Sequence, residues 1–342
     1  MKHPFEELYR AAAAFEESCV LGAAAELDCC TVLLQHGNSL TAYDLAAKIS
    51  CDARGTAMLL DALAAMGYLK KRGMGEDARY SVKERFRAYL DSRHPATAVP
   101  FIRHMACVQR AWTQLSPVIK HGEPPARQPS ILGEEEDRIS FILGMNSVAL
   151  TLVDDVVSAL RQAGVLSFAR NEVEILDVGG ASGTYSLAFL RALPEARGTI
   201  FDLPVGIGEA RKRFAGTEFE QRIRLVSGDF YQDPLPRGFD FVWISAIIHQ
   251  HGRAESRELY RNAMRAINPG GTVAVRDFIM SADRLSPKSG VFFGINMLVQ
   301  TRSGMVYTFD EVKEDLEAAG FVDVALAVPA ASMAAVVVGR KP

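Results

Sequence analysis

The chain has 342 residues, which at roughly 100–200 residues per domain suggests two domains. Apolar residues make up 49%, charged residues 23%, and the mean hydropathy is +0.05, so the chain can fill sizeable cores. A formal net charge of −3 supplies no overall basic excess for nucleic-acid binding. These values exclude disordered, fibrous and tail-driven proteins.

Cysteine usage and the N-terminus both predict a cytoplasmic protein. The five cysteines are odd in number and form no C-x-x-C pair, so they favour reduced thiols over a disulfide framework or a zinc site. The first residues, MKHPFEELYRAAAAFEE, carry acids where a signal peptide needs an apolar stretch. No apolar run approaches the roughly 20 residues of a membrane span.

Residues 1–95 have the pattern of a mainly α-helical winged-helix domain. Apolar residues recur at helical spacing over 4–35, and Thr41 is the expected N-cap of a helix in SLTAYDLAAKI. A polar break, SCDARG, precedes a second amphipathic helix, TAMLLDALAAMGYL, which ends at Gly67. Two short apolar segments around KKRGMGEDA then predict a β-hairpin.

Charge argues against DNA binding by this winged helix. Residues 1–95 carry 12 Lys and Arg against 13 Asp and Glu, and the segment TAMLLDALAAMGYL contains neither Lys nor Arg. A protein that reads bases and phosphates needs those donors. The pattern therefore favours a dimerisation module with an apolar helical surface, with no nucleic-acid partner.

The rest of the chain predicts connecting helices and then an α/β domain. Residues 96–170 are expected to form helices around a loop at HGEPPARQPSILGEEE. In residues 171–342 apolar strands alternate with helices, which is typical of a doubly wound, mostly parallel sheet. The last strand follows its neighbour after only a few residues, which favours an antiparallel hairpin.

The strongest local signal is the segment EILDVGGASG, a short strand running into glycines. Gly179, Gly180 and Gly183 allow close approach of the backbone to a ligand, as nucleotide-type cofactors require. Asp202 ends the next strand 19 residues after Gly183, where an acid binds ribose hydroxyls.

The motifs LDVGGASG, FDLP, GDF, IIHQHG and NPGG, in this order, resemble the class I S-adenosylmethionine-dependent O-methyltransferases. The similarity is to the small-molecule type with an N-terminal winged-helix dimerisation domain, found in plant phenolic and bacterial polyketide methyltransferases. It covers almost the whole chain. It implies a homodimer, a Rossmann-like sheet of seven strands with the last antiparallel, and S-adenosylmethionine as the cofactor.

The resemblance implies a role for each motif residue. The glycine loop faces the methionine moiety, Asp202 binds the ribose and Leu203 contacts the adenine. Asp229 accepts from the adenine amine, Phe230 packs on the ring, and Gly228 precedes both. Ser245 matches a position that contacts the cofactor. The alternatives are that Asp229 only forms a turn and Phe230 only fills the core.

His249 follows the fourth strand, and in the family this histidine deprotonates the substrate hydroxyl. Imidazole is the side-chain group that most often acts as a general base near neutral pH. Asp277, at the end of the next strand, is expected to orient the imidazole. His249 and His251 could instead be two metal ligands, but no third His or Cys is near, so no metal is expected. A purely structural His249 is the other alternative.

Two segments depart from the family pattern. IHQH replaces the usual LHDW, and Val306 occupies the position of a second glutamate in SGMVYT. The expected substrate-lining residues suggest a planar or apolar acceptor: Met145, Asn146, Phe293, Asn296 and Met297.

The leading hypothesis is an O-methyltransferase acting on a hydroxyl of an aromatic, polyketide-like or isoprenoid small molecule. The departures leave open an enzyme of this fold that binds the cofactor but catalyses hydroxylation, decarboxylation or a pericyclic step. A cofactor-sensing transcriptional regulator is the third class considered.

Overall fold

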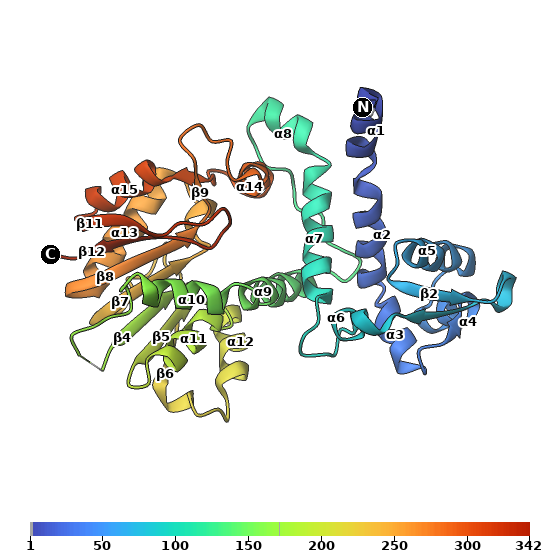
Figure 1. Ribbon diagram of the computed structural model, residues 1–342, viewed down its shortest axis with the longest axis horizontal. Coiled ribbons are helices and arrows are strands. Elements are labelled where there is room, and N and C mark those ends of the chain that lie inside the picture. The colour runs from blue at the N-terminus through green and yellow to red at the C-terminus, as the bar shows by residue number, and fades with distance from the viewer. Residues whose placement is uncertain (1–2, 171) are drawn as a thin grey trace. The chain divides into compact units, whose positions relative to one another are not determined.

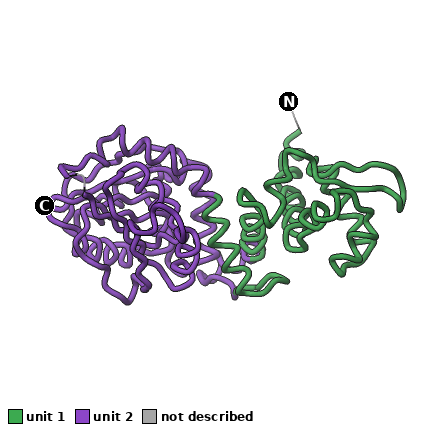
Figure 2. Tube along the Cα trace, turned by 90° about the horizontal axis from the view of Figure 1, so that it is seen from below, with its two compact units in different colours: residues 1–110, 127–147 green, residues 111–126, 148–342 purple. Residues whose placement is uncertain are grey.

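The computed structural model describes residues 3–170 and 172–342, which form two compact units (Figure 2). The first unit comprises Met1–Arg110 and Arg127–Ser147, and the second comprises Ala111–Ala126 and Val148–Pro342. Two long helices, α7 (Val99–Trp112) and α9 (Glu134–Leu150), therefore carry the chain across the division.

The first unit contains the helix, helix and hairpin order expected of a winged helix (Figure 1). Thr41 caps α4 as predicted, because its Oγ1 accepts from the N–H of Asp44 at 3.0 Å. A three-stranded antiparallel sheet has the order β1-β3-β2. The elements before α7 are α1 (Pro4–Ala13), α2 (Phe15–Glu26), α3 (Cys29–Gln35), β1 (Leu40–Thr41), α4 (Ala42–Ile49), α5 (Ala53–Ala65), β2 (Leu69–Arg72), β3 (Arg79–Val82) and α6 (Arg87–Leu90).

Two helix boundaries in this unit differ from the sequence prediction. The single helical stretch expected over 4–35 is three helices, and Asp28 adopts a left-handed conformation with φ +52° between α2 and α3. The helix expected from residue 56 begins at Ala53, because the carboxylate of Asp52 accepts from the N–H of Gly55 at 2.7 Å. The first turn of α5 therefore includes Arg54, which lies before the segment TAMLLDALAAMGYL that was expected to form this helix.

The core of the first unit contains two of the cysteines. Cys29 and Cys30 are 0% and 6% exposed and pack with Leu33, Leu60 and other apolar side chains. Burial raises the pKa of both thiols to about 12, so they stay protonated at neutral pH. They act as small apolar side chains in this core.

The second unit is built on a seven-stranded sheet with the order β11-β12-β8-β7-β4-β5-β6. The strands are β4 (Glu174–Val178), β5 (Arg197–Asp202), β6 (Ile223–Ser227), β7 (Phe239–Ser245), β8 (Ile267–Asp277), β11 (Val322–Val328) and β12 (Ala335–Arg340). Neighbours from β8 to β6 pair in parallel, and β12 pairs antiparallel with both β8 and β11. The mostly parallel sheet and the antiparallel last strand are confirmed.

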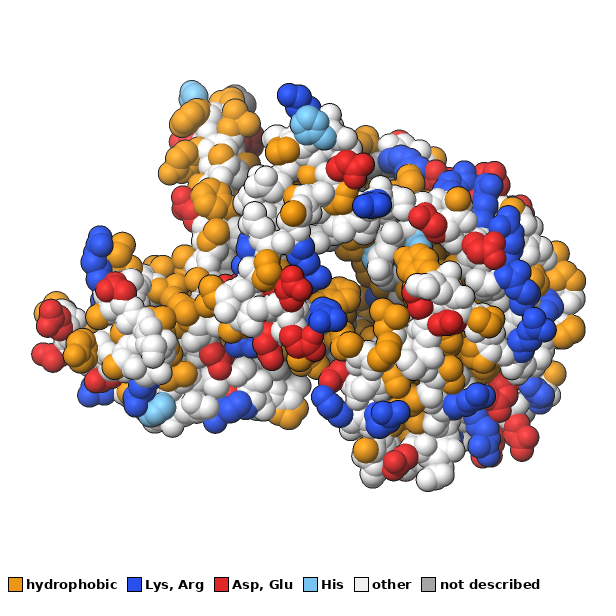
Figure 3. Space-filling model, turned by 180° about the vertical axis from the view of Figure 1, so that it is seen from behind, with side chains coloured by type: hydrophobic (Ala, Val, Ile, Leu, Met, Phe, Trp, Pro, Cys, Tyr) orange, Lys and Arg blue, Asp and Glu red, His pale blue; other side chains and the backbone are white. Residues whose placement is uncertain are grey.

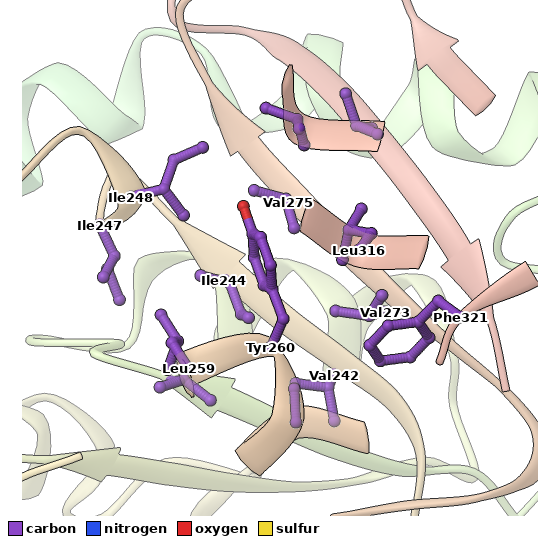
Figure 4. Close-up of a cluster of buried hydrophobic side chains, with 14 of the residues drawn as sticks. Val242, Ile244, Ile247, Ile248, Leu259, Tyr260, Val273, Val275, Leu316 and Phe321 are labelled. Carbon is purple, nitrogen blue, oxygen red and sulfur yellow. The ribbon is translucent and has the colours of Figure 1, made fainter. Parts of the chain in front are cut away.

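Helices cover both faces of this sheet (Figure 1). One face packs on α10 (Val153–Gln162), α11 (Thr184–Ala192) and α12 (Pro204–Phe214) around Phe189 and Trp243. The other face packs on α13 (Arg253–Ala266) and α15 (Phe309–Ala318). Figure 4 shows this second core, in which Tyr260 of α13 lies among the strand residues Val242, Ile244, Val273 and Val275. The sheet is therefore rigid on both faces, with its carboxyl edge left for ligands.

Four elements of the second unit lie outside the alternating pattern. They are α8 (Leu115–His121), α14 (Lys288–Gln300) and a short parallel pair, β9 (Ile279–Met280) with β10 (Tyr307–Thr308). Residues within 288–300 were expected only to line a pocket, and the helix itself was not predicted, because KSGVFFGINMLVQ has little amphipathic periodicity and no capping side chain. The helix α14 contacts α8 and the turn that carries His249.

Membrane-spanning potential is limited in the part of the chain that is described. No single helix there is long and apolar enough to cross a membrane. The bent pair α9 and α10 passes a test of length and composition only.

Candidate active site

A glycine-rich loop leaves the carboxyl end of β4 and enters α11. Gly179 and Gly183 have φ angles of +67° and +76°, a region that glycine reaches without strain. A Cβ at Gly179 would lie 2.5 Å from Cδ1 of Ile247, and one at Gly183 would lie 2.6 Å from the ring of Phe214. Conformation therefore favours glycine at both positions, and a side chain at either would have to displace a neighbour.

Asp177 lies buried beneath this loop. Its Oδ2 accepts from the hydroxyl of Ser186 at 2.7 Å, and burial raises the pKa of Asp177 to about 7. A Cβ at Gly180 would lie 2.7 Å from the same carboxyl group. The acid of the LDVGG motif thus supports the loop from below, and Gly180 is the residue that fits above it.

Asp202 at the end of β5 reaches across to the glycine loop. Its Oδ2 accepts from the N–H of Ala181 at 2.7 Å, and its Oδ1 accepts from the N–H of Leu203 at 2.6 Å. Burial raises the pKa of Asp202, and these two backbone donors partly offset that effect. Each carboxylate oxygen can accept a second hydrogen bond, so the group can still receive two hydroxyls. The adjacent Leu203 side chain is 53% exposed.

The next strand ends at a turn that uses Asp229. Its Oδ1 accepts from the N–H of Tyr231 at 2.9 Å, and its Oδ2 accepts from the amide of Gln232 at 3.0 Å. Phe230 follows Gly228 and Asp229, stacks on Tyr231 with ring centroids 4.9 Å apart, and packs at the edge of the core. Asp229 therefore stabilises a turn in this chain, and its contact with adenine stays a prediction.

Ser245 ends β7 at the level of the glycine loop. Val178 pairs with Ile244, so Gly179 and Ser245 follow on neighbouring strands at the same edge. The hydroxyl of Ser245 accepts from Nη1 of Arg276 at 2.7 Å. The sequence analysis did not single out Arg276, although a cation inside the apolar strand VAVRD was a visible signal.

His249 and Asp277 meet at the ends of β7 and β8. His249 lies in a short 3₁₀ turn after β7, and its Nδ1 is 2.9 Å from both carboxylate oxygens of Asp277. The two residues are 7% and 1% exposed. Because the carboxylate accepts at Nδ1, the proton sits on Nδ1 and the lone pair on Nε2 is available to a substrate. Phe293 stands edge-on to the imidazole, with centroids 4.7 Å apart and planes at 88°.

The two departures from the family pattern have structural consequences. Gln250 is exposed and donates to the carbonyl of Ala246 at 3.3 Å. His251 is 2% exposed, contacts the ring of Tyr231, and has its pKa lowered chiefly by burial. Val306 is 8% exposed and packs with Phe278 and Met280. At the position of the family's second glutamate, this chain therefore has an apolar contact and no carboxylate.

The expected acceptor-side residues fall in two places. Phe293, Asn296 and Met297 lie on α14 in the second unit, where Phe293 contacts His249 and Met297 is buried. Nε1 of Trp112 donates to Oδ1 of Asn296 at 2.9 Å, a partner that the sequence analysis missed. Met145 and Asn146 lie on α9 in the first unit, where both are half-buried.

The site offers acid–base chemistry and ligand binding by backbone and carboxylate groups. Within residues 3–170 and 172–342, no group of three or more His, Cys, Asp or Glu side chains could hold a metal ion. The loop of β4 and the acid of β5 form one half of the edge, and the His249–Asp277 pair of β7 and β8 forms the other. Since β4 and β7 are neighbours, a ligand on the loop and a base at His249 lie at adjoining strand ends.

Family models match both parts of the chain. An O-methyltransferase domain matches residues 128–322, and an O-methyltransferase dimerisation domain matches residues 9–92.

Curated proteins and solved structures match over nearly the full length. The tetracenomycin polyketide synthesis 8-O-methyl transferase TcmO of Streptomyces glaucescens is 31% identical over 336 residues, which cover 96% of this chain and 94% of that protein. A 3-hydroxy-5-methyl-1-naphthoate 3-O-methyltransferase of Streptomyces sahachiroi is 28% identical, over 83% of this chain and 80% of that protein. The crystal structure of human N-acetylserotonin methyltransferase in complex with SAM superposes with a TM-score of 0.82 and 25% identity, over 100% of this chain and 98% of the other.

Proposed function

The chain belongs to the S-adenosylmethionine-dependent O-methyltransferases that join a dimerisation domain to a methyltransferase domain, and from that membership we propose its reaction. We propose that it methylates a hydroxyl group of an aromatic or polyketide-like small molecule, with His249 as the general base. The observation that carries this proposal is the buried pair of His249 and Asp277 beside the glycine loop.

The residues at the ends of β4 and β5 fit the cofactor. The glycine loop leaves the carboxyl end of β4 with φ +67° at Gly179 and +76° at Gly183, and its backbone N–H groups precede α11, an arrangement that can bind a ligand. Asp202 keeps acceptor capacity for two ribose hydroxyls, and the exposed Leu203 offers an apolar surface for a base. When bound, S-adenosylmethionine supplies an electrophilic methyl group on a sulfonium.

His249 and Asp277 supply the proton transfer. A substrate hydroxyl that donates to Nε2 of His249 loses its proton to that nitrogen as the hydroxyl oxygen attacks the methyl carbon of the donor. The bond between that carbon and the sulfonium sulfur breaks in the same step. Asp277 holds the ring through Nδ1 and stabilises the imidazolium that forms. A positioned base of this kind is typically worth about 10²–10⁴ in rate. The two side chains are 7% and 1% exposed, so the pair is held by its surroundings.

The acceptor class is inferred from the surroundings of the base and from the relatives. The ring of Phe293 stands at His249, and Phe278 lies 5.0 Å from Phe293, so planar apolar rings can pack there. The relatives named above act on a polyketide and on a naphthoate. A non-methylating reaction has no such support, because those relatives are named as methyltransferases.

Methyl transfer to a panel of acceptors tests the proposed function. The panel contains phenols, naphthols and an aliphatic alcohol, and the donor carries a labelled methyl group. We expect label on the oxygen of an aromatic hydroxyl. Cofactor binding without transfer to any member would favour the alternative of a non-methylating enzyme.

We further propose that residues 1–95 pair two copies of the chain, that residues 96–170 line the acceptor pocket and that residues 171–342 hold the cofactor. The dimerisation-domain match covers residues 9–92. Figure 3 shows apolar side chains on the surface of α1, at its upper left. Those of Phe5, Leu8 and Tyr9 are 65%, 70% and 66% exposed.

Light scattering after size exclusion tests the dimer. We expect a mass near twice 37.3 kDa for the native chain and a lower mass for the double variant Leu8→Glu and Tyr9→Glu. Met74→Glu, at an apolar side chain 90% exposed on the hairpin, is the matched control and should leave the dimer intact. A monomeric native chain would contradict the proposal.

A further inference from the structure

Arg276 is a buried arginine at the carboxyl edge of the sheet. It is the second-last residue of β8 and only 3% exposed. In the sheet it pairs with Ser245 on β7 and with Val336 on β12. Its neighbour Asp277 points to the opposite face, because side chains alternate along a strand, and that carboxylate is held by His249.

The guanidinium of Arg276 has too few partners for its burial. Nη1 donates to the hydroxyl of Ser245 at 2.7 Å, and the guanidinium carbon lies 5.0 Å from the ring centroid of Tyr185. Nε is buried without a hydrogen-bond partner. Among the described residues, no carboxylate forms an ion pair with this side chain, and burial lowers its pKa.

Such an arrangement is unfavourable unless something else neutralises the charge. A buried cation loses its hydration and normally regains the energy from a paired anion and full hydrogen bonding. Arg276 has five N–H donors but a single neutral acceptor, Ser245. The folded chain alone therefore does not account for an arginine at this position.

The surroundings of Arg276 point to an anion at the glycine loop. Ser245 and Gly179 follow paired residues on adjacent strands, so they share the same level of the edge. Tyr185, over which the guanidinium lies, is in the first turn of α11, directly after the loop. The N-terminus of α11 and the guanidinium of Arg276 thus both place positive potential at the glycine loop.

We propose that Arg276, held by Ser245, binds the α-carboxylate of the amino-acid portion of the methyl donor. This rests on the proposed function, since the donor is the ligand of that function. A carboxylate there completes the hydrogen bonding of the guanidinium and gives the buried charge its partner. Arg276 then fixes the far end of the donor, while Asp202 fixes its ribose.

Two ligands separate this role from a purely structural one. S-adenosylhomocysteine carries the carboxylate, whereas 5′-methylthioadenosine keeps the adenosine and the sulfur but lacks the amino-acid portion. Calorimetry with both ligands is run on the native chain, on Arg276→Met and on Arg276→Lys. We expect Arg276→Met to weaken S-adenosylhomocysteine about tenfold to hundredfold and to change 5′-methylthioadenosine less than twofold. The lysine variant should lie between.

Two further variants keep the test decisive. Ser245→Ala removes only the partner of the guanidinium and should weaken S-adenosylhomocysteine selectively, by a smaller factor. Arg222→Met is the matched control, because Arg222 also lies over an aromatic ring and bonds to the carbonyl of Ala196 at the opposite edge of the sheet. It should leave the ratio of the two affinities unchanged.

The outcomes that overturn the inference are distinct from those that overturn the proposed function. Equal weakening of both ligands in the Arg276 variants, or no weakening of either, would mean that Arg276 is structural. A native chain that binds neither ligand would contradict the cofactor assignment itself.

Discussion

The site has two halves, one at the ends of β4 and β5 and one at the ends of β7 and β8, and different chemical groups form each half. At the ends of β4 and β5, glycines, backbone groups and the carboxylate of Asp202 form the surface, and a Cβ at Gly179 or Gly183 would lie within 2.6 Å of the side chain of Ile247 or Phe214. At the ends of β7 and β8, the reactive groups are side chains, His249 and Asp277, framed by Phe293. A side chain at Gly179 or Gly183 would meet both an unfavourable φ and close neighbours, whereas the lining of the second half can change while the reactive pair stays in place. The departure IHQH contains His249 itself, and Val306 of SGMVYT packs on Phe278, the residue after Asp277.

The largest effect on activity is expected when the hydrogen bond between His249 and Asp277 is altered. Asn in place of Asp277 can donate to Nδ1 and hold the imidazole in the wrong tautomer, so we expect Asp277→Asn to lower kcat about 100- to 1000-fold. The affinity for S-adenosylhomocysteine should stay within about twofold. Steady-state kinetics and calorimetry on the same preparation check both values, and a parallel loss of binding would show that the halves are not separate.

A complementary effect is expected in the other half. Asp202→Ala removes the acceptor of two backbone N–H groups and of the ribose, so we expect binding of S-adenosylhomocysteine to weaken about 30- to 100-fold. Asp323→Ala serves as the control, because Asp323 forms an exposed ion pair with Arg340. If the Asp202→Ala and Asp323→Ala variants bound S-adenosylhomocysteine with equal affinity, Asp202 would not be a cofactor-binding residue.

Replacing Asp177, the buried acid under the glycine loop, is expected to change the free energy of unfolding by a smaller amount that depends on pH. The pKa of Asp177 is about 7 in the folded chain against an ordinary 3.8, so between these values the folded state keeps a proton that the unfolded state releases. Its contribution to stability is full below about pH 4 and is lost as the pH rises to 7. We expect Asp177→Asn to gain about 1.4 kcal/mol relative to the native chain per pH unit in that window. Urea unfolding of the ligand-free proteins at pH 4.5, 5.5 and 6.5 measures it, and a constant difference would contradict the assignment.

The smallest effect is expected at a departure from the family pattern. Gln250 is exposed and bonds to the carbonyl of Ala246, away from the imidazole of His249. Restoring the family's acid with Gln250→Asp should therefore change kcat less than threefold. A larger gain would show that the altered IHQH segment limits this enzyme.

The same contrast explains what could be predicted from the sequence. The mostly parallel sheet, its antiparallel last strand and the place of Asp202 at the end of a strand follow from local signals, namely apolar runs, glycines and an acid at a strand end. The break at Asp28 and the helix over 288–300 were missed, because no glycine marks the first and no amphipathic period marks the second. The partners of Arg276 and Trp112 depend on strand register and on packing across 31 and 184 residues of sequence, which periodicity does not reveal.

The central claim is that His249 removes the proton in a methyl transfer whose donor is held by residues other than the His249–Asp277 pair. His249→Gln tests it most directly, with methyl transfer to an accepted aromatic hydroxyl and binding of S-adenosylhomocysteine measured on one preparation. We predict a rate lowered about 10²–10⁴-fold and a Kd within about twofold of the native value. A rate within threefold of the native chain, with binding intact, would contradict the role of His249.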